Sequence, residues 1–316
     1  MSGAELYTGP IIDAHHHVWE PRKHNYPWLS GALLVPHRYG DYTPVKRDYL
    51  PADYRRDAEG VNIAATVYVE AEWDPADPLG ETRYVSGLAR EHGLPNAIVA
   101  QAWLHRDDAG EVLAGQAAFG LVRSVRHKPE GAASPAEVAT GRRTLMSDER
   151  WRSGYALLER HGLHFDLQTP WWNLAEAAEL ARDFPRTTLI VNHAGVPGDR
   201  SPETLAGWRA GMEALAARPN VVVKISGLCL PGRAWSVDDN AEVVATILRL
   251  FGPQRVMFGS NFPVDGLCAS FGEIFDGFRR IASSWSPAEQ RAMFWETGLR
   301  IYRPELSDAN RGMPTA

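Results

Sequence analysis

Three histidines stand at the ends of two strand-like apolar runs, where they would meet in one site. His15 and His17 end the first run, and His193 ends the sixth. Side chains alternate between the two faces of a strand, so His15 and His17 point the same way and His16 points the opposite way. Two imidazoles from one strand, together with a third from another strand, are suited to bind a divalent ion such as Zn²⁺, which accepts nitrogen ligands. We therefore predict that His15, His17 and His193 form a functional site rather than three separate structural histidines.

Cationic and amide side chains end other apolar runs. Arg126 and His127 end the fourth run, Gln168 ends the fifth, and Lys224 ends the seventh. A guanidinium binds a carboxylate in a bidentate manner, and an amide or amine can orient a substrate oxygen. We predict that these four residues bind the substrate, whereas Arg123 lies on the opposite strand face. An ion pair with a neighbouring carboxylate is the alternative for each cation.

The segment 18–47, which follows the first run, is rich in aromatic and proline residues and has no clear period. Structureless connections beyond roughly 12–15 residues are often lids or binding loops. We predict that this segment is a lid over the site and that its Tyr26 and Trp28 face the ligand. A second aromatic loop, after the fifth run, places Trp171 on the same face. Packing against the protein is the alternative for all three rings.

Eight short runs rich in Val, Ile and Leu alternate with helix-like segments, as in parallel strands that are buried on both faces. This order predicts an α/β fold, a closed (β/α)8 TIM barrel, whose active site lies at the carboxyl ends of the strands. No Gly-x-Gly-x-x-Gly turn follows a run, which argues against a dinucleotide fold. The predicted strands are Ile11–His17, Ile63–Glu70, Ala97–Leu104, Leu121–His127, Leu163–Gln168, Thr188–His193, Val221–Ser226 and Arg255–Ser260.

The chain of 316 residues fits one such barrel, so we predict a single domain over residues 1–316 with a flexible polar tail at 304–316. Six helices are predicted between the strands, with a weaker pattern after the third strand. They are Tyr84–His92, Trp151–His161, Leu174–Asp183, Leu205–Ala217, Ala241–Phe251 and Phe271–Ile281.

Composition excludes several classes of partner. A net charge of -6 gives no basic surface for nucleic acid or anionic membranes. No stretch approaches the roughly 20 apolar residues that cross a bilayer, and the first ten residues do not resemble a signal peptide. Two cysteines, Cys229 and Cys268, do not make a disulfide framework. We expect a cytoplasmic protein with a small-molecule substrate. The sequence is compatible with a homo-oligomer but does not determine the oligomeric state.

The motifs at the strand ends resemble those of a known family. Asp13-Ala14-His15-His16-His17 fits the Asp-x-His-x-His pattern that opens barrels of the amidohydrolase superfamily, amidohydrolase-2 type. The chain resembles the branch of predicted metal-dependent TIM-barrel hydrolases, which includes sugar lactonases, the pyrone-dicarboxylate lactonase and the sulfomuconolactone hydrolase. The matching order spans residues 12 to about 302 and favours Arg126 as a substrate anchor. Further matching segments are Val125-Arg126-His127, Val191-Asn192-His193-Ala194-Gly195, Lys224-Ile225-Ser226-Gly227-Leu228 and Phe258-Gly259-Ser260-Asn261-Phe262-Pro263-Val264-Asp265.

The chain departs from the family at Asn261, where the family carries the aspartate that activates the hydrolytic water. An amide neither takes a proton at neutral pH nor carries charge. Three alternatives follow. A carboxylate elsewhere supplies the base, with Asp265, Glu70 and Glu72 as candidates; His193 or a metal-bound hydroxide suffices; or the protein binds a ligand without turning it over.

The resemblance implies hydrolysis of a small lactone that carries a carboxylate or several hydroxyls, with Arg126 and Lys224 as anchors. It also implies a divalent metal, zinc first, on His15, His17 and His193, and no organic cofactor. Metal occupancy stays open, because the branch includes a metal-independent lactonase and Asn261 removes a usual ligand. The alternatives are non-oxidative decarboxylation of an aromatic or unsaturated acid, and a non-catalytic ligand-binding barrel.

Overall fold

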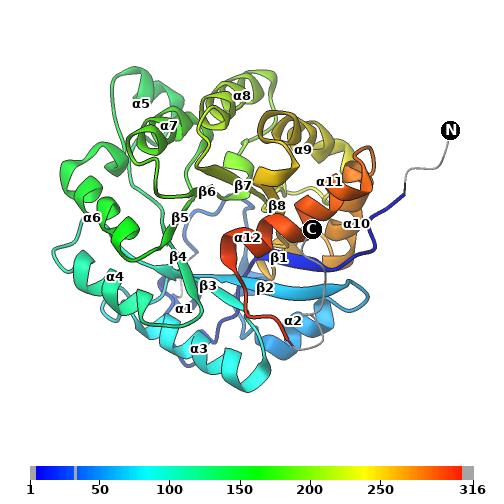
Figure 1. Cartoon of the computed structure of the whole chain (residues 1–316), viewed down its shortest axis with the longest axis horizontal. Helices are drawn as coiled ribbons and strands as arrows, with labels where there is room; N and C mark the ends of the chain where they lie inside the picture. Colours follow the sequence, from blue (N-terminus) through cyan, green and yellow to red (C-terminus); the bar gives the residue numbers. More distant parts are fainter. Residues whose placement is uncertain (1–4, 32–33, 308–316) are drawn as a thin grey trace.

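Eight parallel strands form one sheet in chain order, from β1 to β8, and helices surround it (Figure 1). A computed structural model describes residues 5–31 and 34–307. The sheet closes at the mouth of the barrel, where His17 N donates to Phe262 O (2.8 Å) and Asn261 N donates to His15 O (2.7 Å). The predicted TIM barrel is therefore confirmed. The strands are β1 Ile11–His16, β2 Ile63–Val69, β3 Ala97–Gln101, β4 Val122–His127, β5 His164–Leu167, β6 Leu189–Val191, β7 Val221–Ile225 and β8 Val256–Phe258.

All six predicted helices are present, with ends that move by a few residues. The connection after β3 also holds a helix, and several other helices are too short to show a period in the sequence. The helices are α1 Pro27–Ser30, α2 Pro51–Asp57, α3 Gly80–His92, α4 Ala109–Ala117, α5 Pro135–Ala139, α6 Glu149–Arg160, α7 Leu174–Asp183, α8 Pro202–Ala216, α9 Val237–Phe251, α10 Phe271–Ala282, α11 Pro287–Arg291 and α12 Thr297–Tyr302. Within the described ranges, no helix combines the length and apolar character needed to span a bilayer.

The last helix, α12, lies across the centre of the barrel (Figure 1). Ile301 and Tyr302 pack there with Ile12, Val67 and other apolar side chains of the barrel interior. A larger apolar layer separates the strands from the outer helices. The barrel interior thus has a floor made by the end of the chain, which leaves the carboxyl ends of the strands for the site.

Most of the predicted lid and the start of the predicted tail are described in the structure. The segment 18–47, predicted as a lid, contains α1 and a 3₁₀ turn at Thr43–Val45 among its described residues. The predicted tail is anchored at its start, since Glu305 N donates to Asn96 O (2.9 Å) and Asn96 Nδ2 donates to Glu305 O (2.8 Å). Residues 308–316 lie outside the described part.

Candidate active site

The three predicted histidines meet at the mouth of the barrel. The ring centroid of His15 lies 4.5 Å from that of His193 and 5.1 Å from that of His17. Ala14 faces the apolar barrel interior, so regular alternation along the strand would turn His15 and His17 to the other face. A register shift between Asp13 and His16 changes this alternation and lets the two rings face the site. His16 points outward and packs on Tyr54 of α2, with 4.5 Å between ring centroids. The predicted opposition of His16 to its two neighbours is confirmed.

Hydrogen bonds determine which ring nitrogens face the site. Nδ1 of His17 donates to the carbonyl oxygen of Val69 (2.8 Å), which leaves its Nε2 as a lone pair. Nδ1 of His193 lies 3.0 Å from Oγ of Ser226. Neither ring nitrogen of His15 has a hydrogen-bond partner in the described part of the chain. Burial lowers the pKa of all three rings well below the ordinary value, so they are neutral at pH 7.

Neutral imidazoles with free nitrogens have the chemistry of zinc ligands, but their placement is not that of a metal centre. Among the described residues, no three His, Cys, Asp or Glu side chains lie close enough together to hold a metal ion. Asn261 stands where a fourth, charged ligand would be expected. The histidines therefore do not fit a preformed three-ligand zinc site in this arrangement.

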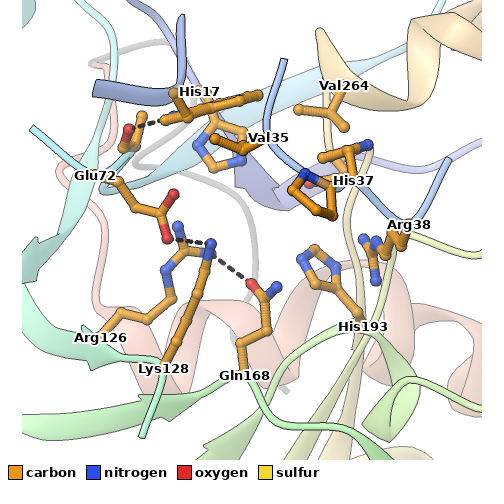
Figure 2. A pocket seen from close by; sticks show the side chains of 14 residues that line it. His17, Val35, His37, Arg38, Glu72, Arg126, Lys128, Gln168, His193 and Val264 are labelled. Atoms are coloured by element: carbon orange, nitrogen blue, oxygen red, sulfur yellow. Dashed lines mark hydrogen bonds and ion pairs between the residues drawn. The ribbon is translucent and has the colours of Figure 1, made fainter. Parts of the chain in front are cut away.

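A cavity of about 300 Å³ opens above the histidines, and we call it the central cavity (Figure 2). Its volume is at the lower end of the range for small-molecule sites. Strand ends form its base, and the segment 35–38 of the lid covers one side. Its lining residues are His17, Trp28, Val35, Pro36, His37, Arg38, Ala71, Glu72, Arg126, Lys128, Gln168, His193, Asn261 and Val264.

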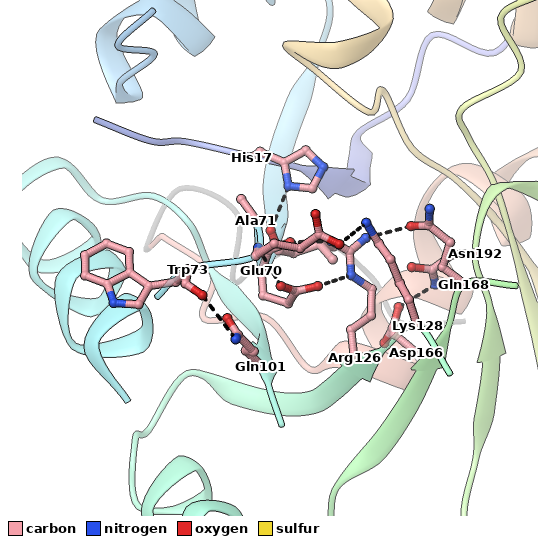
Figure 3. A network of polar contacts seen from close by, with 12 residues as sticks. His17, Glu70, Ala71, Trp73, Gln101, Arg126, Lys128, Asp166, Gln168 and Asn192 are labelled. Atoms are coloured by element: carbon pink, nitrogen blue, oxygen red, sulfur yellow. Dashed lines mark hydrogen bonds and ion pairs between the residues drawn. The ribbon is translucent and has the colours of Figure 1, made fainter. Parts of the chain in front are cut away.

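Two of the three cations in the central cavity are paired with carboxylates. Arg126 is buried and pairs with Glu70 (Figure 3), and Lys128 pairs with Glu72 (Figure 2). Arg126 Nη1 also donates to Oε1 of Gln168 (3.2 Å). The ion-pair alternative for Arg126 is thus confirmed, although its guanidinium still lines the cavity.

Arg38, the third cation, has no carboxylate in ion-pair contact within the described residues. Its guanidinium lies over the ring of Tyr39, 4.6 Å from the centroid. A Cβ at Gly227 would collide with both Arg38 Nη2 and His193 Nδ1, so these two side chains meet over that glycine. Gly227 has a φ of +61°, which favours glycine for a second reason. The lid thus places an unpaired positive charge beside His193.

Asn261 lines the central cavity, and Asp265 lies behind it. Nδ2 of Asn261 donates to Oδ1 of Asp265 (2.6 Å), so the amide oxygen of Asn261 is turned away from Asp265. Asp265 is buried, and burial raises its pKa to about 6, while the charge of Arg38 opposes this shift. Asp265 therefore orients the amide and does not itself line the cavity, which weakens its prediction as the base.

Known proteins resemble this chain over nearly its whole length. Residues 12–303 match the family model described as amidohydrolase. The chain belongs to the amidohydrolase family. It is 30% identical to an L-fucono-1,5-lactonase of Burkholderia multivorans over 94% of this chain and 98% of that protein. It is 36% identical to an uncharacterized protein, y4mH, of Sinorhizobium fredii, over 93% of this chain and 98% of that one.

A solved structure of an amidohydrolase also resembles this chain over nearly its whole length. The crystal structure of a Burkholderia multivorans amidohydrolase with bound zinc superposes with a TM-score of 0.79. It shares 28% sequence identity with this amidohydrolase, and the match covers 94% of this chain and 100% of that one.

Two predicted aromatic contacts are wrong in this amidohydrolase. Tyr26 is fully buried, with its ring 5.1 Å from that of Trp73, and it does not line the central cavity. Trp171 lies against α8, where a Cβ at Gly207 would collide with its ring. Trp28 does line the cavity, and its Nε1 donates to Ala71 O (2.8 Å). Each ring is amphipathic, so the sequence alone did not separate packing from binding.

Three residues that were predicted to bind the substrate or act as the base do not line the central cavity. Lys224 is fully buried and pairs with Asp166 (2.7 Å), so it does not bind the substrate. His127 faces away from the central cavity and accepts a hydrogen bond from Trp151 Nε1 (2.9 Å). Glu70 is not a free base, because one oxygen pairs with Arg126 and the other accepts from the backbone N–H of Glu72.

The sequence did not single out residues 35–38 of the lid, which line the central cavity. His37 stacks on Trp28, with 6.1 Å between centroids, and it lines the central cavity beside Arg38. Burial lowers the pKa of His37 to about 4. The signal was present in the sequence, since a histidine and an arginine adjoin inside a lid that was expected to face the site.

Behind the cavity wall, Glu81 should make the protein more sensitive to alkali. It accepts hydrogen bonds from Tyr68 Oη and Ala71 N, both 2.7 Å, and burial raises its pKa to about 8. The folded state then holds a proton that the unfolded state releases near pH 4.5, so stability falls as pH rises between these values, by up to about 1.4 kcal/mol per pH unit. We expect Glu81→Gln to be more stable than the wild type at pH 8 and no more stable at pH 4.5, as measured by urea unfolding. An equal difference at both pH values would contradict this assignment.

Proposed function

We propose that this amidohydrolase hydrolyses a small lactone that carries a carboxylate. The observation that carries the proposal is the unpaired Arg38 beside neutral His193 in the central cavity, because such a cation binds an anionic group and such an imidazole accepts a proton. The likeness to an L-fucono-1,5-lactonase supports ester-ring hydrolysis as the reaction class.

In this reaction, Arg38 binds the carboxylate of the substrate, and the outward N–H groups of Arg126 contact the ring oxygens. The attacking water would lie between Asn261 and His193, which both line the central cavity. If Nδ1 of His193 donates to Ser226 Oγ, its Nε2 carries the lone pair that receives the proton of that water. The water oxygen attacks the lactone carbonyl, the ring C–O bond breaks, and the proton passes from His193 to the leaving alkoxide of the same molecule. The products are one hydroxy acid and the free enzyme.

Zinc would add a Lewis acid to this scheme. His15, His17 and His193 would be its candidate ligands, although as placed they form no three-ligand group among the described residues. Every assay is therefore run with and without added zinc.

The test of the reaction class is a screen of lactones and carboxylated esters with a pH indicator, while carbon dioxide release is followed in parallel. We expect acid release from carboxylated lactones. Carbon dioxide release without hydrolysis of any lactone or ester would overturn the proposal in favour of decarboxylation. Binding of carboxylated ligands with neither reaction would favour the non-catalytic alternative.

Replacing Arg38 with methionine should raise KM for a carboxylated lactone by about 10- to 100-fold, because one charge-assisted contact contributes about 1.5–3 kcal/mol. The kcat should change less, and an uncharged lactone should be hydrolysed as by the wild type. Arg22→Met is the matched control, since Arg22 lies in the same lid and pairs with Asp48 at the surface. Equal effects of Arg38→Met on charged and uncharged lactones would remove Arg38 from substrate recognition.

A further inference from the structure

A second cavity, of about 430 Å³, adjoins the central cavity on the side of β3 and β4, and we call it the side cavity. The two cavities share Glu72, Arg126 and Lys128 as lining residues. These three side chains therefore form the wall between the cavities. In the proposed reaction, the lactone ring contacts only the side of this wall that faces the central cavity.

The wall has one fixed part and one part that opens easily. Arg126 and Glu70 are buried, with 3% and 4% of their side chains exposed, and removing either partner would leave a buried charge. Lys128 and Glu72 are far more exposed, at 39% and 45%. A pair with that exposure contributes only about 0–1 kcal/mol. A ligand that separates Lys128 from Glu72 thus joins the two cavities at small cost.

The side cavity offers one oriented donor. Nδ1 of His127 accepts the indole N–H of Trp151 (2.9 Å), and an indole only donates, so the proton of the neutral imidazole is on Nε2. His127 is 8% exposed and lines the cavity, and no described residue accepts a hydrogen bond from its Nε2. Burial lowers the pKa of His127 to about 4, which is consistent with the neutral form.

A hydrogen-bond acceptor lines the same cavity. Nε2 of Gln101 donates to Trp73 O (3.3 Å), which leaves Oε1 of Gln101 for a ligand (Figure 3). Trp103, Ala102 and Pro75 supply apolar surface around these polar atoms.

The cations that line the side cavity are paired with carboxylates of the protein. Arg106 forms a bidentate pair with Asp108, through bonds of 2.8 and 2.9 Å. Arg126 and Lys128 have the partners described above. A ligand here needs hydrogen-bonding groups and C–H surface more than charge, and a carbon chain with several hydroxyls has both.

We infer that the side cavity binds a neutral polyhydroxylated chain of the substrate, whose lactone ring lies in the central cavity. This inference rests on the proposed function for the position of the ring. The polyhydroxylated chain of the substrate passes between Lys128 and Glu72. One of its hydroxyls donates a hydrogen bond to Gln101 Oε1, and another accepts a hydrogen bond from His127 Nε2. The central cavity thus selects the anionic ring, and the side cavity selects the length and hydroxylation of its substituent.

The test measures binding and does not depend on hydrolysis. Trp151 reports on the side cavity, because its indole N–H is bonded to His127. Its NMR signal is identified with Trp151→Phe in protein labelled with ¹⁵N at tryptophan. A six-carbon open-chain sugar acid should shift this signal, whereas glycerate, a three-carbon acid, should bind without shifting it. Shifts of equal size with both acids, or with neither, would overturn the inference.

Two variants of the side cavity complete the test. Trp103→Ala and Gln101→Met should each weaken binding of the six-carbon acid by about 10-fold and leave the affinity for glycerate unchanged. Trp172→Ala is the matched control, since Trp172 is also half-buried and lines neither cavity. Equal losses for both acids in the two variants would contradict a separate side-cavity contact. Selective binding without any lactone hydrolysis would keep this inference and reject the proposed function.

Discussion

Replacing Asp166 with asparagine should destabilise the protein by about 3–5 kcal/mol at pH 7, because it leaves the ammonium of Lys224 buried without a counter-charge. Asp166 is the centre of a fully buried polar cluster in the barrel interior. Besides Lys224, it accepts hydrogen bonds from Ser124 (2.7 Å), Asn192 (2.8 Å) and Tyr302 (2.9 Å). Burial already lowers the pKa of Lys224, and Asp166 opposes that shift. Chemical denaturation of Asp166→Asn and the wild type measures the loss.

The pH dependence separates charge from shape. Without Asp166, Lys224 gives up its proton in the folded state at a lower pH than in the unfolded state, so the stability of Asp166→Asn should rise between pH 7 and 10. Adding Lys224→Met to Asp166→Asn removes the charge and should recover part of the loss at pH 7. A loss that is the same at every pH, or below about 1 kcal/mol, would contradict a charged Lys224.

Changing Asn261 to aspartate alone should destabilise the protein by about 2–4 kcal/mol at pH 8, rather than create an efficient base. Asn261 Nδ2 lies 2.6 Å from the carboxylate of Asp265 in a buried setting, and two carboxylates at that distance cannot both ionise. The folded variant keeps a proton that the unfolded chain releases, so the loss should shrink as pH falls to 5. Unfolding of Asn261→Asp at the two pH values checks both the size and the sign.

The exchange Asn261→Asp with Asp265→Asn restores one amide and one carboxylate, with the carboxylate now facing the central cavity. We expect its stability to return to within about 1 kcal/mol of the wild type, since the donor–acceptor pair is restored. We also expect lactone turnover to rise by about 10-fold or more, because a positioned general base contributes 10²–10⁴-fold. A double variant as unstable as the single one would show that Asp265 has another role.

The sequence was sufficient for the barrel because its signals are local. Short β-branched runs, helix-stopping glycines and the order of elements determine where the strands fall, and the ends of β1 to β8 agree with the prediction within a few residues. Short elements such as α1 and α12 were missed, since they have too few residues to show a period. The outward placement of His16 was predicted from alternation, although the shift after Asp13 was not.

The site was only partly predictable, because the sequence of one strand does not show how deep a side chain lies in the barrel or which residue of another strand it pairs with. His17, Arg126, Gln168, His193 and Asn261 do line the central cavity. Lys224 ends its strand in the same way, yet it lies one layer deeper, on a buried carboxylate from another strand. The pairing of Glu70 could not be predicted locally, because its partner Arg126 comes from β4, 56 residues later. The cation that is free to meet a substrate, Arg38, lies in a segment without a period.

Because α12 forms the floor of the barrel, the apolar interior cannot be closed until this helix has been synthesised. Tyr302, whose hydroxyl bonds to Asp166, emerges from the ribosome 136 residues after its partner. Until then, the buried carboxylate lacks this donor and the apolar barrel interior is open at one end. A nascent chain cannot finish its core ahead of its last helix, so a chain cut short before α12 would expose that interior to chaperones and proteases. Only molecules that include α12 have a closed barrel interior, so the synthesis of this helix is the step that completes the native core.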